Sequence, residues 1–173
     1  LYKNKLDPTY LIGGKLKTDD PHVKLGNSTY LITETDESDP RFTILKPHLI
    51  ILTNLDKEHL ENYRNSYKNL EASMKQFINS LPFYGQAFIN GDDPNSLKLL
   101  KYINRETFTY GFKTHNQLKA YDVTYDKQTM KFNFTYNNKI YSISTNLLGK
   151  HNVYNILAAI SVGIHLEIDI EKI

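Results

Sequence analysis

The sequence predicts an α/β fold, in which a mostly parallel sheet flanked by helices carries a small antiparallel β meander. Three observations predict it. Residues 49–52 form a continuous apolar run, which is typical of a strand buried on both faces of a parallel sheet. Strand and helix patterns then alternate as far as residue 111. From residue 118 onward, apolar side chains recur at every second position, as in antiparallel strands.

The first helix is expected over about residues 66–81. Its apolar side chains recur at helical spacing on one face, and Pro82 ends it because a proline disfavours helical geometry in the residue before it. Residues 86–90 are predicted to be a short strand and residues 95–103 a second helix. Residues 107–111 return as a strand. This β-α-β-α-β alternation indicates parallel strands joined by right-handed connections.

Residues 118–146 are predicted to form the antiparallel β subregion, with three runs that alternate between apolar and polar side chains. Asn137 and Asn138 form a turn suited to residues with positive φ. The last element is a helix over about residues 150–165, whose apolar side chains gather on one stripe. We see no internal repeat or low-complexity linker, so residues 1–173 are expected to be one domain.

Composition excludes several classes of protein. With 40% hydrophobic and 23% charged residues, the chain has the make-up of a soluble globular domain. The pI is about 8.6, but the net charge is only +2 and no basic stripe supports a nucleic-acid partner. Cysteine is absent, which excludes disulfides and thiolate metal sites. Without a membrane-length apolar run or a signal peptide, the sequence predicts a cytoplasmic location and no membrane partner, and it leaves the oligomeric state open.

Two polar segments each follow a strand-like run and carry side chains that bind metals. Residues 33–39 contain Glu34, and residues 53–59 contain His59. If the two strands are neighbours in a parallel sheet, both segments lie at the carboxyl edge, where such sheets bind ligands. Glu34 and His59 would then hold Mg²⁺ or Mn²⁺, although imidazole is an unusual magnesium ligand. The ordinary polarity of loops explains the same pattern equally well.

The first of these segments is strongly acidic, since it also contains Asp36, Glu37 and Asp39. Carboxylates crowded together repel one another. The cluster therefore favours a bound cation or a nearby cationic group.

His151 and Asn155 stand four residues apart at the start of the last predicted helix, on the side opposite its apolar stripe. A helix N-terminus offers free N–H groups and a partial positive charge, which suits nucleotides. An Asn amide can pair with a purine's donor and acceptor, and an imidazole can pack on the ring. A solvated polar face at a helix start is nevertheless the simpler interpretation of this pattern alone.

Two glycine-containing segments carry no phosphate-loop signal. Gly13-Gly14-Lys15 lacks the Gly-x-x-x-x-Gly-Lys-Ser/Thr spacing of a P-loop, and that string occurs nowhere in the chain. The segment 91–94 is interpreted as a turn leading into a helix, whose dipole its acidic residues complement. No catalytic side chain is identified from the sequence.

A set of short stretches, in one order, resembles the central, ATP-binding domain of the Mur ligases. The stretches are residues 7–14, 25–28, 34–39, 53–54, 58–59, 81–85, 92–94, 109–112 and 149–155. Each is modest alone, but the ordered set is specific and spans nearly the whole chain. The Glu-x-Asp-Glu-Ser-Asp form and the Leu-Pro-Phe-Tyr-Gly string resemble the members that join L-alanine to UDP-N-acetylmuramate. Members that recycle murein tripeptide, which usually have Tyr in place of Ser38, are the alternative.

The resemblance implies a function in peptidoglycan biosynthesis with ATP and Mg²⁺ as cofactors. By this resemblance, Glu34 and His59 help to hold the metal, and His151 and Asn155 contact the adenine of ATP. The implied reaction has ATP phosphorylate the muramate carboxylate to an acyl phosphate, which the amine of L-alanine attacks through a tetrahedral intermediate. The resemblance therefore favours the functional interpretation of both residue pairs.

The chain also departs from the family pattern. Glu58 stands where the family normally has Asp, which affects how the neighbouring imidazole is held, and Thr35 replaces a usual Ala. The family's glycine-rich phosphate loop and its two flanking domains are not found in these residues. We therefore expect a fragment truncated at both ends, without ligase activity on its own. A degenerate, non-catalytic Mur-like domain kept for binding is the alternative class, and an in-frame phosphate loop in the flanking DNA would argue against it.

Overall fold

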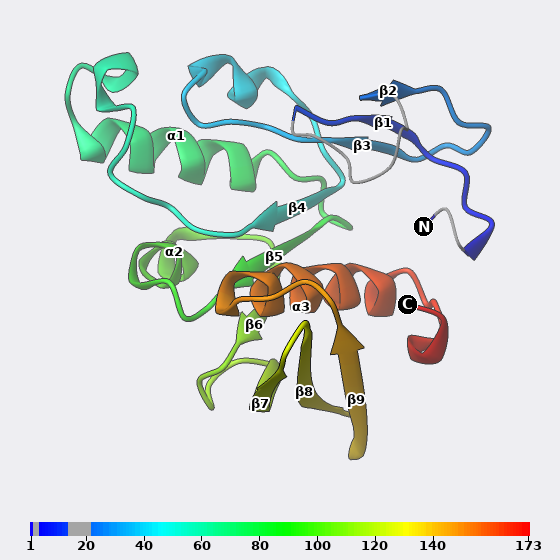
Figure 1. Ribbon diagram of the computed structural model, residues 1–173. Helices are drawn as coiled ribbons and strands as arrows, with labels where there is room; N and C mark the ends of the chain where they lie inside the picture. Colours follow the sequence, from blue (N-terminus) through cyan, green and yellow to red (C-terminus); the bar gives the residue numbers. More distant parts are fainter. Residues whose placement is uncertain (2–3, 14–21) are drawn as a thin grey trace.

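The computed structural model describes residues 1, 4–13 and 22–173, so Gly14 and Lys15 lie outside the described residues. It contains a six-stranded sheet in the order β4-β5-β6-β7-β8-β9 and a three-stranded sheet in the order β2-β1-β3 (Figure 1). The strands are β1 Thr9–Leu11, β2 Val23–Lys24, β3 Leu31–Thr33, β4 Leu49–Leu52, β5 Gln86–Asn90, β6 Glu106–Gly111, β7 Leu118–Asp126, β8 Thr129–Tyr136 and β9 Lys139–Thr145. The α-helices are α1 Tyr67–Asn79, α2 Pro94–Leu99 and α3 Lys150–His165.

The predicted parallel sheet is confirmed, and β5 is its most buried strand. β5 pairs in parallel with β4 on one side and β6 on the other, and all five of its residues are buried. Its alternate side chains enter two cores. Ala87 and Ile89 pack with α1, α2 and β4, whereas Phe88 packs with α3 and the later strands. Helices therefore cover both faces, as the unbroken apolar runs predict.

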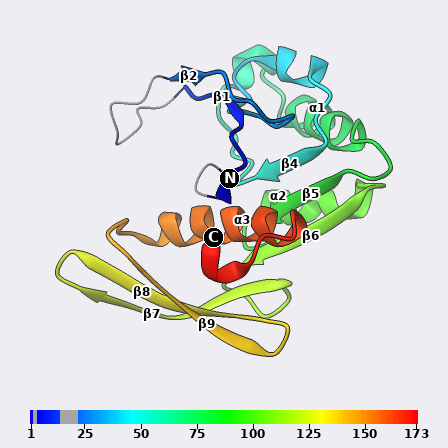
Figure 2. The same cartoon turned by 90° about the vertical axis from the view of Figure 1, so that its right-hand side faces the viewer.

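The antiparallel meander is also confirmed. β7, β8 and β9 pair in antiparallel order, and β7 joins β6 in parallel through two residue pairs. Met130, Phe132 and Phe134 point from β8 into the core beneath α3. Asn137 and Asn138 have φ values of 49° and 61°, as predicted for the turn. Figure 2 shows these long strands extending under α3 as one curved layer.

The predicted helices match with small differences at their ends. The first spans Tyr67–Asn79. The second is shorter than expected, because Pro94–Leu99 is α-helical and Leu100–Tyr102 continues it as a 3₁₀ helix. The last, Lys150–His165, agrees with its predicted bounds. Further 3₁₀ helices are Pro40–Ile44, Leu60–Tyr63 and Ile170–Lys172. Among the described residues, no helix has the length and apolar character needed to cross a bilayer.

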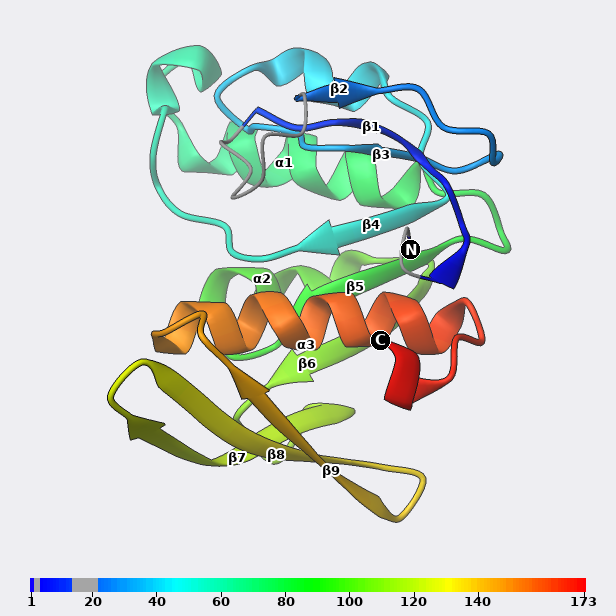
Figure 3. The ribbon, with the colours of Figure 1, turned by 45° about the vertical axis from the view of Figure 1, so that its right-hand side comes forward.

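One expectation about the sheet is wrong. The strand before Glu34 is β3, which pairs in parallel with β1 in the three-stranded sheet and is not a neighbour of β4 (Figure 3). All three residues of β3 are exposed, so this strand lacks the apolar burial of a central strand. The 3₁₀ helix Pro40–Ile44 separates it from β4 and buries Phe42 against Phe77 of α1.

The hydroxyl of Tyr110 supports a stability prediction. This side chain is fully buried on β6, and its hydroxyl donates to the carbonyl oxygen of Leu52 at 3.1 Å. Tyr110→Phe should lower the free energy of unfolding by about 1–2 kcal/mol, because a buried carbonyl loses a partner. Urea denaturation measures the change. Tyr125→Phe, at a tyrosine that is 57% exposed, is the matched control. Equal stability of the two variants would contradict this role of the hydroxyl.

Candidate nucleotide and metal site

The loop after β4 is fixed to the carboxyl edge of the six-stranded sheet. Asn90, the last residue of β5, donates to the carbonyl oxygen of Thr53 at 2.9 Å. Asp93 accepts from the backbone nitrogen of Leu55 at 3.2 Å, and Asn95 donates to its carbonyl oxygen at 2.8 Å. Leu55 itself is buried. The loop that leads to His59 is therefore held by side chains from the end of β5, from the turn before α2 and from the first turn of α2.

The acidic loop after β3 lies against the 3₁₀ helix that follows His59. Asn62 donates to the carbonyl oxygen of Ser38 at 2.6 Å. The hydroxyl of Tyr63 donates to the carbonyl oxygen of Glu37. Although β3 and β4 belong to different sheets, these two contacts bring together the segments that carry the predicted metal ligands.

The structure gives each predicted metal ligand a defined neighbour. Glu34 is exposed, and one of its carboxylate oxygens accepts from the backbone nitrogen of Gly13 at 2.8 Å. His59 has a left-handed backbone with φ of 52°, and its Nδ1 lies 3.7 Å from a carboxylate oxygen of Glu61. Hydrogen bonds from Ser38 lower the pKa of Asp36.

Part of the acidic cluster is neutralised within the chain. Asp39 binds the guanidinium of Arg41, with a shortest contact of 2.6 Å, and these bonds lower the pKa of Asp39 to about 2. Arg41 is therefore a nearby cationic group of the kind that the acidic sequence favours. Asp36 has its own pKa lowered through Ser38, so it too is ionised at neutral pH.

The donor chemistry fits a magnesium ion that takes most of its ligands from elsewhere. Among residues 1, 4–13 and 22–173, no three His, Asp or Glu side chains form a group that would hold a metal. Magnesium usually keeps several waters and binds through one or two protein side chains plus substrate phosphates. A carboxylate and an imidazole on adjoining segments are compatible with that arrangement, but not with a closed protein cage.

The first turns of α3 carry His151 and Asn155, both exposed. Asn152, a residue not predicted to belong to the site, connects them. The amide nitrogen of Asn152 lies 3.1 Å from Nε2 of His151, and its amide oxygen lies 3.5 Å from the amide nitrogen of Asn155. Asn152 also donates to the carbonyl oxygen of Leu148 at 2.7 Å, which ties the group to the start of the helix. The position of Asn152 directly after His151 is the feature of the sequence that could have identified it.

A second group of residues that was not predicted from the sequence surrounds Asp92. Its carboxylate accepts from the backbone nitrogens of Phe112 at 2.6 Å and Lys113 at 3.1 Å, from the amide of Asn116 at 2.7 Å, and from the hydroxyl of Tyr154 at 3.0 Å. Burial would raise the pKa of Asp92, but these hydrogen bonds outweigh it and lower the pKa. The turn 91–94 is thus more than a helix start, and it contacts α3 directly.

The neighbouring Asp93 has the role predicted for this turn. Its carboxylate accepts from the backbone nitrogen of Ser96 at 2.8 Å and so caps the N-terminus of α2. The turn therefore contributes one carboxylate to α2 and another to α3. Because α3 runs back over the sheet, its N-terminus lies at the same edge as the carboxyl ends of β4 and β5 (Figure 3).

Comparisons with known proteins identify the family. A model described as the Mur ligase middle domain matches residues 20–163. The UDP-N-acetylmuramate–L-alanine ligase of Hydrogenovibrio crunogenus is 43% identical over an alignment of 174 residues, which covers 100% of this chain and 38% of that protein. The ligase of the same name from Dichelobacter nodosus is 42% identical over 170 residues, covering 97% of this chain and 36% of that protein.

Solved structures share the fold. The UDP-N-acetylmuramate–alanine ligase of Thermotoga maritima has a TM-score of 0.84 at 24% identity, covering 99% of this chain and 38% of its own. The Neisseria meningitidis UDP-N-acetylmuramate:L-alanyl-γ-D-glutamyl-meso-diaminopimelate ligase also has a TM-score of 0.84, at 20% identity, covering 99% of this chain and 57% of its own. The chain spans a little over a third of the length of the curated relatives named above. It belongs to the Mur ligase family, whose middle domain it matches over residues 20–163.

Proposed function

We propose that this chain is the nucleotide-binding part of an ATP-dependent ligase that joins L-alanine to UDP-N-acetylmuramate in peptidoglycan biosynthesis. One geometric observation carries the proposal: the acidic loop, the His59 turn and the start of α3 are all tied to the carboxyl edge of the parallel sheet. Identity of 43% along the chain to a ligase of this name supports the choice of substrates. The ligase would work in the cytoplasm, the location that the sequence predicts.

In this proposal the two residue pairs serve different parts of the nucleotide. Glu34 and His59 would hold Mg²⁺, which supplies neutralisation of the charge on the phosphate oxygens during phosphoryl transfer. His151 and Asn155 would contact the adenine, with Asn152 orienting both through its amide. The carboxylate of UDP-N-acetylmuramate would receive the γ-phosphoryl group. The amine of L-alanine would then displace phosphate to form the amide.

A second substrate choice follows from the equal TM-score of the Neisseria meningitidis ligase, whose name specifies a tripeptide in place of L-alanine. The fold therefore does not separate the two substrates. Ser38 favours L-alanine, because the tripeptide members usually have Tyr at this position. Its backbone oxygen accepts from Asn62, so the residue is held where the acidic loop meets the helix after His59.

The intact ligase that contains this chain should release phosphate from ATP only when UDP-N-acetylmuramate and L-alanine are both present. A coupled phosphate assay measures this, with the tripeptide L-alanyl-γ-D-glutamyl-meso-diaminopimelate as the competing amine. Preference for the tripeptide would overturn the choice of L-alanine. Absence of turnover with either amine, in a folded protein, would indicate the degenerate, non-catalytic alternative.

His59→Ala in the intact ligase should lower kcat about 10- to 100-fold and raise the Mg²⁺ concentration needed for half-maximal rate, as loss of a metal-site partner usually does. Steady-state rates across a magnesium titration provide the measurement. His48→Ala is the control, because His48 stacks on Tyr84 at the opposite end of the sheet. An unchanged rate and magnesium dependence would remove His59 from the site.

Asn155→Ala should raise the KM for ATP about fivefold while changing kcat less, since a neutral hydrogen bond is lost in ground state and transition state alike. The KM for L-alanine should stay the same. Asn133→Ala, on the outer face of the meander, is the control for loss of an amide. If the KM for ATP is unaltered in Asn155→Ala, the residue does not contact the adenine.

A further inference from the structure

Tyr154 directly precedes Asn155 on α3, and its side chain points into the fold. Its hydroxyl donates to Asp92 at 3.0 Å. Its ring meets that of Phe112 edge to face, with centroids 5.0 Å apart and planes at 90°. The pKa of Tyr154 is raised to about 12 by burial and by Asp92, so the hydroxyl keeps its proton at neutral pH. Tyr154 therefore has a fixed polar partner and a fixed apolar one.

The carboxylate that receives this hydroxyl is itself immobilised. Asp92 also binds Phe112, Lys113 and Asn116, all in the short link between β6 and β7. A Cβ at Gly111, where φ is +158°, would lie 2.6 Å from the Asp92 carboxyl carbon, so glycine permits this close approach. Three segments of the chain thus converge on one carboxylate at the carboxyl edge of the sheet.

Asn116 shows that this convergence has a cost. Its amide nitrogen binds Asp92 and the carbonyl oxygen of Lys113, while its amide oxygen is buried without a hydrogen-bond partner among the described residues. Buried polar atoms are nearly always paired in folded proteins. The chain retains an unpaired amide oxygen here, while the amide nitrogen is shared between Asp92 and the carbonyl oxygen of Lys113.

The start of α3 is held by contacts of several kinds, including Lys150, whose Nζ lies 4.8 Å from the centre of the Phe112 ring. The N-cap residue of α3, Gly149, makes no side-chain capping bond, and the next two residues are exposed. Val153 is fully buried, but its side chain is apolar and makes no directional hydrogen bond. At 100° per residue, Tyr154 lies about 60° around the helix from His151 and about 100° from Asn155. The bond to Asp92 is a directional contact between these turns and the edge of the sheet, so it contributes to their rotation about the helix axis.

We propose that Asp92 and Tyr154 are positioning residues that aim the polar face of α3 at the nucleobase and so determine the preference for adenine over guanine. This inference rests on the proposed function, in which Asn155 contacts the adenine. Neither positioning residue touches the nucleotide. Their contribution is to keep α3 in the one rotation from which the Asn155 amide reaches the base edge.

The test is Tyr154→Phe in the intact ligase, which removes the hydroxyl and keeps the ring that packs on Phe112. If the competent rotation falls to about a fifth of the population, the KM for ATP rises about fivefold. The KM for GTP should change little, because guanine does not gain from the Asn155 contact. The ATP-over-GTP preference in kcat/KM should thus fall about fivefold, whereas a general loss of stability would affect both nucleotides equally.

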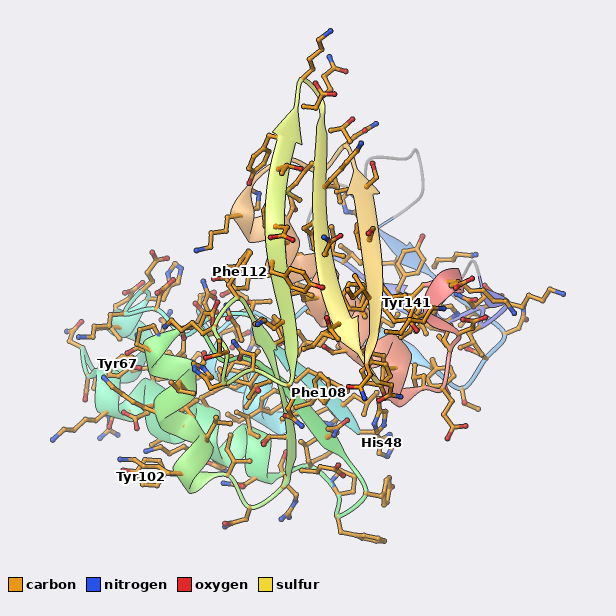
Figure 4. The ribbon with its side chains drawn as sticks, turned by 90° about the horizontal axis from the view of Figure 1, so that it is seen from below. His48, Tyr67, Tyr102, Phe108, Phe112 and Tyr141 are labelled. Carbon is orange, nitrogen blue, oxygen red and sulfur yellow. The ribbon has the colours of Figure 1, made fainter. Side chains whose placement is uncertain are left out.

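A double-mutant cycle separates positioning from an independent effect. If Tyr154 acts through Asn155, Tyr154→Phe should add no further loss to Asn155→Ala, while independent effects would multiply. Tyr141→Phe is the matched control, since Tyr141 stacks on Phe134 and lies across the meander from Phe112 (Figure 4). It should leave both KM values unchanged.

The possible failures are distinguishable. If Asn155→Ala changes ATP selectivity but Tyr154→Phe does not, the positioning role is overturned and the adenine contact stands. If neither variant changes selectivity, the adenine contact itself fails. A Tyr154→Phe effect that multiplies with Asn155→Ala would also overturn positioning through Asn155.

Discussion

The carboxyl end of β5 is the point on which the candidate site depends. β5 is buried on both faces, and its polar side chains stand at its two ends, Gln86 and Asn90. Asn90 holds the loop that leads to His59, and Asp92 holds the link after β6 and the start of α3. Asp93 also binds the loop that leads to His59, through the backbone nitrogen of Leu55, and it caps α2. A single turn therefore positions segments that are far apart in the sequence.

The protonation behaviour of this junction keeps it intact across neutral pH. The folded pKa of Asp92 lies below its usual value of 3.8, so its contribution to stability is complete above that value and is lost as pH falls through the lower folded pKa. Tyr154 has the opposite sign. Its pKa is raised from 10 to about 12, so its contribution is complete below 10 and is lost as pH rises through 12. Between these limits the hydrogen bond joins a charged acceptor to a neutral donor.

The parts of the fold that local patterns specify were predictable, and the parts that depend on distant partners were not. The bounds of α3 and the positive φ of Asn137 follow from helical periodicity and turn chemistry, which act within a few residues. The pairing of β3 with β1 does not follow from such local patterns. The sequence around Leu31 is that of an ordinary strand, and its exposure depends on how the whole chain folds. Asp92 read as part of a turn because its partner on α3 is 62 residues away. The predicted metal ligands were chosen by residue type and by the family resemblance. The neighbours that the structure gives them, such as Gly13 for Glu34, had no local signal in the sequence.

The two halves of the candidate site are built differently, and this bears on how each would bind. The polar face of α3 is backed by buried side chains and by the Asp92 carboxylate, so it is organised before a ligand arrives. The acidic loop is exposed and is attached to its neighbour through two backbone carbonyl oxygens. Because α3 is firmly supported and the acidic loop is not, recognition of the base by the preformed surface of α3 is favoured. On the opposite side, the coordination shell of the cation would be completed by the phosphates themselves. In the proposed site, discrimination between nucleobases would therefore belong to the helix, and the loops would need only to tolerate the shared triphosphate.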